Sequence, residues 1–221
     1  MAISHFHSHY DEGTDDEVLR LHEVYSMHQQ NPREAKYRSI LERGYKVGAV
    51  GGSDSHRWPV GHLCGDPDSI WHQPEIIDGE VGSQSMQKKC GLQATFAGDR
   101  TPEELWEAMS KRHTYGTTGA RIVLLFHVND HPMGETVTVD EGDPLTLRIR
   151  AGGTTELREV TVVKYDGATW SEPIREHPTS TRFCDLSRRD TAVPGNLYFV
   201  RVVQMDGEPA WSSPVWLSRP A

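Results

Sequence analysis

Short β-prone runs separated by turns fill the second half of this chain, and they constrain its fold more than any other feature. Residues 145–150 alternate apolar and polar side chains with a period of two, as in a strand with one buried face. Two further runs, 160–165 and 197–203, each lead into an Asp-Gly pair, which is typical of a hairpin turn. Short strands spaced by such turns predict an antiparallel β-sandwich over residues 119–221.

The first half of the chain combines an amphipathic helix with a buried strand. Tyr37, Ile40 and Leu41 recur at helical spacing and give the predicted helix one apolar face. Gly44 follows at the position where a helix commonly ends. Residues 47–52 then form a short apolar run that leads into a glycine-rich loop. A helix followed by a buried strand is typical of an α/β unit.

A second helix is marked by its capping residues. Thr101 is a favourable N-cap, Pro102 suits the first helical position, and Glu104 completes a capping box. The composition of the chain changes shortly after this helix. We therefore predict two domains, an α/β portion over residues 1–118 and the β-sandwich over residues 119–221.

Histidine is concentrated in the first half, where eight of the twelve histidines lie between His5 and His72. The three cysteines, Cys64, Cys90 and Cys184, are far apart in the sequence. They do not resemble a disulfide framework or a Cys-rich zinc motif, and they fit a reducing, cytoplasmic compartment. A metal site in this chain is therefore expected to use imidazole and carboxylate ligands.

The sharpest local motif is the segment Gly51-Gly52-Ser53-Asp54-Ser55-His56, directly after the apolar run. A carboxylate and an imidazole one residue apart, at the carboxyl end of a strand, can project from one turn onto one or two metal ions. Glycines at this point allow the close approach of a ligand. The alternative is that the segment is an ordinary turn with a surface histidine.

A second cluster of histidines lies at the N-terminus, in His5-Phe6-His7-Ser8-His9. Alternating residues of an extended segment share one face, so His5, His7 and His9 can point the same way. Nitrogen ligands in this arrangement suit Zn, Mn or Fe. The alternative is a frayed terminus whose histidines bind nothing.

Single histidines lie in other parts of the first half. His28 follows a β-prone run and is either a site residue or a core or surface histidine. His62 and His72 lie in a long irregular segment that can close over a site. His22 and Glu23 are neighbours in the β-prone run, so strand alternation predicts that they face opposite sides and do not share a site.

The charge balance narrows the classes of partner. The chain carries 23 Lys and Arg against 32 Asp and Glu, a formal charge of −9 with histidine neutral. This balance gives no reason to expect binding to a nucleic acid or to an anionic membrane surface. No apolar run reaches the ~20 residues of a membrane span, and the first residues do not resemble a signal peptide. The motifs of serine hydrolases, P-loop NTPases and dinucleotide-binding enzymes are absent from the sequence.

Several segments, taken together, resemble one protein family. They are Glu23-Val24-Tyr25-Ser26-Met27-His28, Val50-Gly51-Gly52-Ser53-Asp54-Ser55-His56, Tyr115-Gly116-Thr117-Thr118-Gly119-Ala120-Arg121-Ile122, and the stretches 198–204 and 210–214. In order and spacing they resemble the C-terminal part of the DUF3604 group, within the polymerase-and-histidinol-phosphatase (PHP) superfamily of metallohydrolases. The N-terminal H-x-H region of that family is expected to lie upstream of Met1.

The resemblance implies an α/β fold, a partial PHP-type β/α-barrel that holds divalent metal ions, with the β-sandwich appended. It implies that Asp54 and His56 bind metal, together with a histidine that maps onto His7, with His5 or His9 as competing registers. It also implies catalytic roles for Asp54 and His28. A half-barrel exposes apolar strand edges, so a homo-oligomer is expected to cover them.

These inferences lead to a metal-dependent hydrolase of phosphoester bonds (mono-, di- or triester) as the first functional hypothesis, with a metal-activated water. The expected substrate is a small phosphorylated or anionic molecule, which the positive field of the metal attracts. Two alternatives stay open. One is a catalytically degenerate remnant that acts in binding or assembly, and the other is a metal-dependent hydrolase of esters or lactones.

Overall fold

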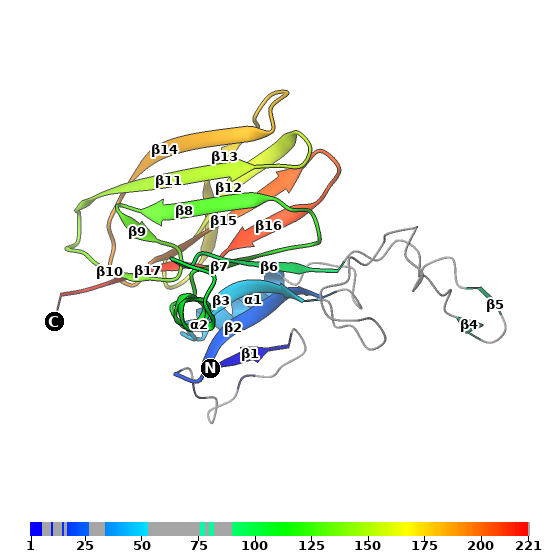
Figure 1. The fold of residues 1–221 in the computed structure, drawn as a ribbon. Coiled ribbons are helices and arrows are strands. Elements are labelled where there is room, and N and C mark those ends of the chain that lie inside the picture. Colours follow the sequence, from blue (N-terminus) through cyan, green and yellow to red (C-terminus); the bar gives the residue numbers. More distant parts are fainter. Residues whose placement is uncertain are drawn as a thin grey trace.

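The computed structural model describes residues 1–5, 10, 15, 17–26, 34–52, 76–77, 80–81 and 90–220 of the chain. The N-terminal residues among them form a three-stranded parallel sheet in the order β1-β2-β3 (Figure 1). Its strands are β1 (Ala2–Ser4), β2 (Leu19–Ser26) and β3 (Gly48–Gly52). Helix α1 (Glu34–Glu42) lies between β2 and β3 in the sequence. This part of the chain is a short β-α-β unit that β1 extends by one strand.

Helix α1 forms where apolar side chains fall on one helical face. Tyr37, Ile40 and Leu41 are its buried residues, as their spacing predicts. Just beyond the helix, Gly44 takes a left-handed φ of 87° and donates its N–H to the Leu41 carbonyl at 3.0 Å. Gly44 therefore terminates this helix, which confirms the prediction.

The rest of the described chain forms two larger sheets and a two-stranded pair. The eight-stranded sheet has the order β10-β17-β15-β16-β7-β6, with β12 pairing with both β15 and β13, and the four-stranded sheet has the order β14-β11-β8-β9. The strands of the eight-stranded sheet are β6 (Leu92–Thr95), β7 (Thr114–Thr117), β10 (Thr136–Thr138), β12 (Leu157–Tyr165), β13 (Trp170–Glu176), β15 (Leu197–Gln204), β16 (Pro209–Ser212) and β17 (Val215–Ser218). Those of the four-stranded sheet are β8 (Val123–Val128), β9 (His131–Pro132), β11 (Pro144–Gly152) and β14 (Phe183–Thr191). Helix α2 (Pro102–Ser110) joins β6 to β7, and β4 (Ile76–Ile77) pairs with β5 (Glu80–Val81).

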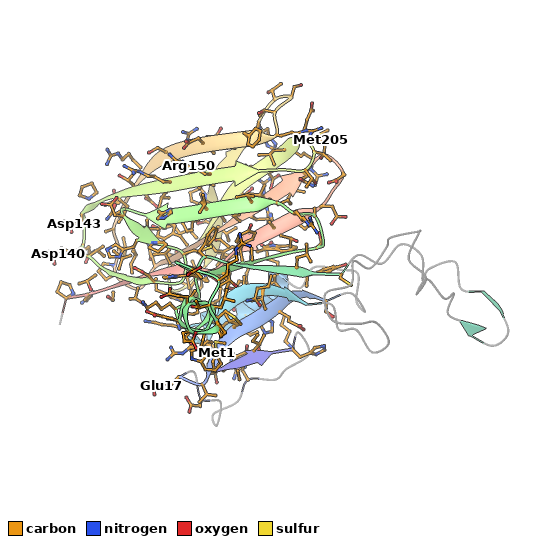
Figure 2. All side chains as sticks on the ribbon, in the orientation of Figure 1. Met1, Glu17, Asp140, Asp143, Arg150 and Met205 are labelled. Carbon is orange, nitrogen blue, oxygen red and sulfur yellow. The ribbon has the colours of Figure 1, made fainter. Side chains whose placement is uncertain are left out.

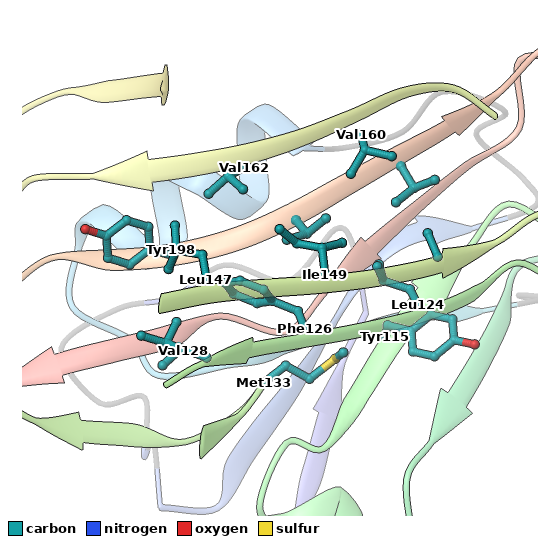
Figure 3. Close-up of a cluster of buried hydrophobic side chains, with 14 of the residues drawn as sticks. Tyr115, Leu124, Phe126, Val128, Met133, Leu147, Ile149, Val160, Val162 and Tyr198 are labelled. Carbon is teal, nitrogen blue, oxygen red and sulfur yellow. The ribbon is translucent and has the colours of Figure 1, made fainter. Parts of the chain in front are cut away.

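The two larger sheets face each other, and side chains fill the space between them (Figure 2). Phe126, Leu147 and Ile149 of the four-stranded sheet pack in one core with Val160 and Val162 of the eight-stranded sheet (Figure 3). Full burial of such a side chain contributes roughly 1.5–3 kcal/mol of hydrophobic stabilisation. The alternating run at 145–150 lies in β11 and supplies several of these inward-facing residues.

Both predicted hairpins are present. Strand β12 leads through Gly167, with a φ of 90°, into its antiparallel partner β13. Strand β15 leads through Gly207, with a φ of 88°, into its antiparallel partner β16. A positive φ strains residues with a Cβ, which explains why glycine stands second in each Asp-Gly pair.

A second core lies on the other side of the eight-stranded sheet, where it meets α1 and the parallel sheet. Strand β15 contributes to both cores, because Leu197 and Phe199 belong to the second core whereas Tyr198 and Val200 belong to the first. A strand that is buried on both faces reads as a nearly continuous apolar run. The described residues thus form three layers, with the eight-stranded sheet in the middle.

A partly buried ionic cluster ties α1 to this middle layer. Glu34, the first residue of α1, accepts a hydrogen bond from the Trp211 indole N–H at 2.8 Å. The Arg201 guanidinium, on β15, lies 3.0 Å from Glu34 Oε1. Arg38 of α1 pairs with Glu34 and, at 3.1 Å, with Glu172 of β13. Arg201, the only charged residue in the apolar run of β15, therefore lies against α1.

The predicted partial β/α-barrel is wrong. Within the described part of the chain, only β1, β2, β3 and α1 follow a parallel β/α arrangement, and no further strand continues it into a barrel. The Ala49 N–H of β3 donates to Ser213 Oγ at 3.0 Å, and the Ala49 carbonyl accepts from Thr114 Oγ1 at 3.0 Å. The hydroxyl groups of Thr114 and Ser213 therefore form the hydrogen bonds with Ala49 that a fourth parallel strand would otherwise make.

The predicted domain boundary and the predicted homo-oligomer are not decided by the arrangement of the strands. The domain boundary between residues 118 and 119 stays a prediction, although β6 and β7 bond into the same sheet as β10, β12, β13, β15, β16 and β17. The homo-oligomer also stays a prediction. No described helix is both long and apolar enough to cross a membrane.

Candidate functional site

The parallel sheet brings one histidine and one glutamate together near its carboxyl end. Ser4, the last residue of β1, is paired with His22 of β2. The next residues, His5 and Glu23, therefore lie side by side, with His5 Nε2 3.8 Å from Glu23 Oε2. The His5 side chain is 41% exposed, and that of Glu23 is 16% exposed. An accessible imidazole thus faces a largely buried carboxylate.

The Glu23 carboxylate rests against Gly52, the last residue of β3. A Cβ added to Gly52 would lie 1.9 Å from Glu23 Oε1, far below any real contact distance. Gly91 packs on the same residue, and its N–H donates to the Gly52 carbonyl at 3.1 Å. Glycine at position 52 is therefore explained by the room that Glu23 takes. The sequence motif predicts that a ligand uses this room, whereas a side chain of the protein occupies it.

His22 points to the opposite face of β2 from Glu23. Its Nδ1 lies 2.7 Å from Ser4 Oγ and 3.1 Å from the Tyr10 hydroxyl, and its ring stacks on Tyr37 with the centroids 6.0 Å apart. Burial is the largest cause that lowers the pKa of His22 to about 3, so the ring is neutral at pH 7. The prediction that His22 and Glu23 do not share a site is confirmed.

Most of the predicted site residues lie outside the described residues. They are His7, His9, His28, Asp54, His56 and, in the long irregular segment, His62 and His72. Among the residues that the structure does describe, no group of three or more His, Cys, Asp or Glu side chains is arranged to hold a metal ion. Of the predicted ligands, the structure therefore shows only the position of His5, together with the ends of β1, β2 and β3. The metal-binding and catalytic roles stay predictions.

The sequence gives no prediction that Glu23 lies beside His5. Strand alternation correctly puts Glu23 on the opposite face from His22. No local sequence pattern shows that Glu23 contacts His5, which lies 18 residues earlier in the chain. The available signal is the same alternation applied to two parallel strands. Since Ser4 and His22 are paired and share one face, His5 and Glu23 must share the other.

The cysteines depart from the sequence expectation. Cys90, which is buried just before β6, is disulfide-bonded, and its partner lies outside the described residues. Cys184 is the free cysteine of the described part. The sequence pattern, which does not resemble a disulfide framework, gave no sign of this bond. Cysteine usage no longer argues for a reducing compartment, and the cytoplasmic location stays a prediction.

Comparison with known proteins finds relatives that are much longer than this chain. The chain is 29% identical over 147 residues to an uncharacterized protein of Chlamydia pneumoniae, covering 61% of this chain and 24% of that protein. It is 26% identical over 207 residues to an uncharacterized protein of Chlamydia trachomatis, covering 87% of this chain and 30% of that protein. The chain thus spans between about a quarter and a third of the length of these relatives.

Two further comparisons concern folds and families. The crystal structure of an engineered protein is similar at 18% identity with a TM-score of 0.31, covering 44% of this chain and 20% of that one. Residues 38–138, which run from within α1 to the end of β10, match the model of the family described as "Protein of unknown function (DUF3604)".

Proposed function

We propose that this chain contributes to a divalent-metal site and acts as a metal-dependent hydrolase of phosphoester bonds. The observation that carries the proposal is that β1, β2 and β3 are neighbours in one parallel sheet. The sequence segments that follow these strands hold every candidate site residue, with His5 to His9 after β1, His28 after β2, and Asp54 to His56 after β3. Ligands of α/β sheets bind outside the carboxyl ends of the strands.

His5 is the candidate ligand whose surroundings fit a metal ion. Its imidazole is accessible and has a carboxylate oxygen 3.8 Å away. Imidazole nitrogen and carboxylate oxygen are ligands that suit Zn²⁺, Mn²⁺ or Fe²⁺. The proposed ligands of one or two ions are His5, His7, His9, Asp54 and His56.

The resemblance to the PHP superfamily supports hydrolysis as the reaction, and the DUF3604 match includes Asp54 and His56. When bound, a divalent ion would lower the pKa of a coordinated water toward 7 and polarise a phosphoryl oxygen. Asp54 would hold that ion, and His28 would donate a proton from a ring nitrogen to the leaving oxygen. Since the relatives are several times longer than this chain, the activity of the whole proteins is part of the proposal.

Metal content and hydrolysis test the proposal together. We expect purified protein to contain close to one equivalent or more of Zn, Mn or Fe by mass spectrometry, and to hydrolyse at least one aryl phosphate ester. Asp54→Ala is expected to lose most of the metal and the activity, because it removes a charged ligand. Asp185→Ala is the matched control, because Asp185 is 70% exposed on β14 in the four-stranded sheet. Metal-free protein, or activity unchanged in Asp54→Ala, would contradict the proposal, and hydrolysis of only carboxylic esters or lactones would redirect it to those substrates.

A further inference from the structure

We propose that the open edge of β14 binds a second copy of this chain, so that the two β14 strands pair antiparallel about a two-fold axis at Ser187. Within the described part of the chain, β14 pairs only with β11 and forms the end of the four-stranded sheet. An unpaired strand edge is a template for pairing with another strand. The inference goes beyond the proposed function and does not depend on a metal ion, because β14 lies on the opposite side of the molecule from β1 (Figure 1).

Every second residue of β14 directs its backbone groups to this open edge. Just before the strand, the Arg182 carbonyl accepts from the Gly153 N–H at 2.8 Å, and just after it the Ala192 N–H donates to the Asp143 carbonyl at 2.8 Å. Both bonds face the β11 side, and successive residues of a strand direct their N–H and C=O groups to opposite sides. The residues whose backbone groups point to the open edge are therefore Phe183, Asp185, Ser187, Arg189 and Thr191.

The side chains of these five residues are exposed, and their charges match those of a reversed copy of the strand. Ser187 is the fifth of the nine residues, so an axis there pairs the whole strand. It places Asp185 opposite Arg189 of the partner, and Arg189 opposite the partner's Asp185. Phe183, which is 75% exposed, lies opposite the partner's Thr191. Opposite charges and aromatic–β-branched pairs stabilise facing strands.

The other positions for the axis fit less well. An axis at Asp185, Arg188 or Arg189 places that residue opposite itself, so that like charges meet. An axis at Leu186 places Asp185 opposite Ser187 and leaves the charges unmatched. The order of residues in β14 thus favours one register, in which the small and uncharged Ser187 faces its own copy.

The contacts that Asp185 and Arg189 make within the chain leave both able to bind across the edge. Arg150 Nε donates to Asp185 Oδ2 at 3.0 Å, and Arg189 Nη1 donates to Thr146 Oγ1 at 2.8 Å. A carboxylate has a second oxygen, and a guanidinium has further N–H groups. The partner that fits this edge is therefore a strand with the same charges in reverse order, which a second copy of β14 supplies.

Exchange of the two charges tests the inference. Sedimentation velocity of the full chain at about 1–100 μM is expected to show a monomer–dimer equilibrium. Asp185→Arg and Arg189→Asp, made singly, are each expected to weaken the dimer by about 10-fold or more, because the two-fold axis repeats each like-charge pair twice. The double variant restores opposite charges and is expected to recover most of the lost affinity. Arg100→Asp, at an exposed position just before α2, is the control for the change in charge and is expected to dimerise as the wild type does.

Cysteine cross-linking tests the register directly. In a Cys184→Ser background, which removes the free cysteine of the described part, Ser187→Cys is expected to give a disulfide-linked dimer when a mild oxidant is added. The two Cα atoms of residues that face each other in this way lie about 5.5 Å apart, a distance that a disulfide spans. Thr191→Cys is the matched control, because the two copies of residue 191 lie roughly 25 Å apart in this register.

Three results would overturn the inference. They are a wild type that stays monomeric over the whole concentration range, a dimer that neither single charge reversal weakens, and equal cross-linking through positions 187 and 191. A double variant that recovers no affinity would overturn the pairing of Asp185 with Arg189. Far-ultraviolet circular dichroism shows whether each variant is folded, and the cross-linking decides if a charge variant is not. None of these results alters the proposed function, since metal binding is measured separately.

Discussion

Replacing Arg201 by methionine will lower the free energy of unfolding by about 3–5 kcal/mol, the range found when one partner of a buried ion pair is removed. The Arg201 side chain is 18% exposed, and its guanidinium lies 3.0 and 3.1 Å from the two oxygens of Glu34. It also lies 3.2 Å from Glu159 and 3.2 Å from Glu172. Burial acts to lower the pKa of Arg201, but the charge of Glu34 and the other carboxylates raises it overall, so the group stays charged. Without Arg201, the three partly buried carboxylates of Glu34, Glu159 and Glu172 keep only Arg38 and Arg175 as compensating charges.

Arg150→Met is the matched control for this prediction. Arg150 also forms an ion pair, with Asp185 at 3.0 Å, but both side chains are 70% exposed on the outside of the molecule (Figure 2). Exposed pairs contribute about 0–1 kcal/mol, so this variant is expected to unfold at nearly the wild-type urea concentration. Urea unfolding at pH 7.5 measures both variants. Equal losses for the two would show that the cluster around Arg201 does not secure α1 to the eight-stranded sheet.

Acidification will destabilise the protein through His22. The pKa of this ring is about 3 in the folded chain against an ordinary value of 6.5, and burial is the main cause. Between these two values the unfolded chain binds one more proton than the folded chain, so the free energy of unfolding falls as the pH falls. The slope is about 1.4 kcal/mol per pH unit, and the full stability is present above pH 6.5. Between pH 6.5 and pH 5.0 this residue alone is expected to remove about 2 kcal/mol.

The variant His22→Asn isolates this contribution from that of the carboxylates. Its amide does not titrate but can still hydrogen-bond with Ser4 and Tyr10, which contact His22 Nδ1 in the wild type. Urea unfolding at pH 7.5, 6.5 and 5.0 is expected to show a shallower pH dependence in the variant by that ~2 kcal/mol. An NMR titration of the wild type gives an independent reading. A His22 ring that titrates near pH 6.5 in the folded protein would refute the prediction.

Local sequence patterns are sufficient to predict many elements but not their assembly. The spacing of Tyr37, Ile40 and Leu41 predicts α1, and the two Asp-Gly pairs predict the hairpins, because these patterns depend on residues close in sequence. The barrel prediction is wrong because a barrel requires a fourth parallel strand beside β3, and distant side chains bond the β3 backbone instead. The backbone of Ala49 bonds Thr114 and Ser213, which are 65 and 164 residues away, and no periodicity reports such contacts.

The same limit applies to the candidate site. Motif and spacing select His5 and the segments after the three strands, and strand alternation separates His22 from Glu23 correctly. The pairing of Ser4 with His22, which brings Glu23 to His5, is a tertiary contact that no single segment encodes. The motif leads to the prediction that Gly52 makes room for a ligand. The Glu23 side chain of β2 fills that room instead, and the sequence alone does not show this contact.

The central claim is that a divalent ion binds at the carboxyl end of the β1-β2-β3 sheet. A crystal structure of the Zn²⁺-loaded protein, with anomalous scattering recorded on both sides of the zinc edge, tests it most directly. We predict an anomalous peak about 2.0–2.2 Å from a ring nitrogen of His5, with Asp54 and His56 bound to the same ion or its neighbour. A fully loaded protein whose anomalous peak lies away from His5, Asp54 and His56 would contradict the claim.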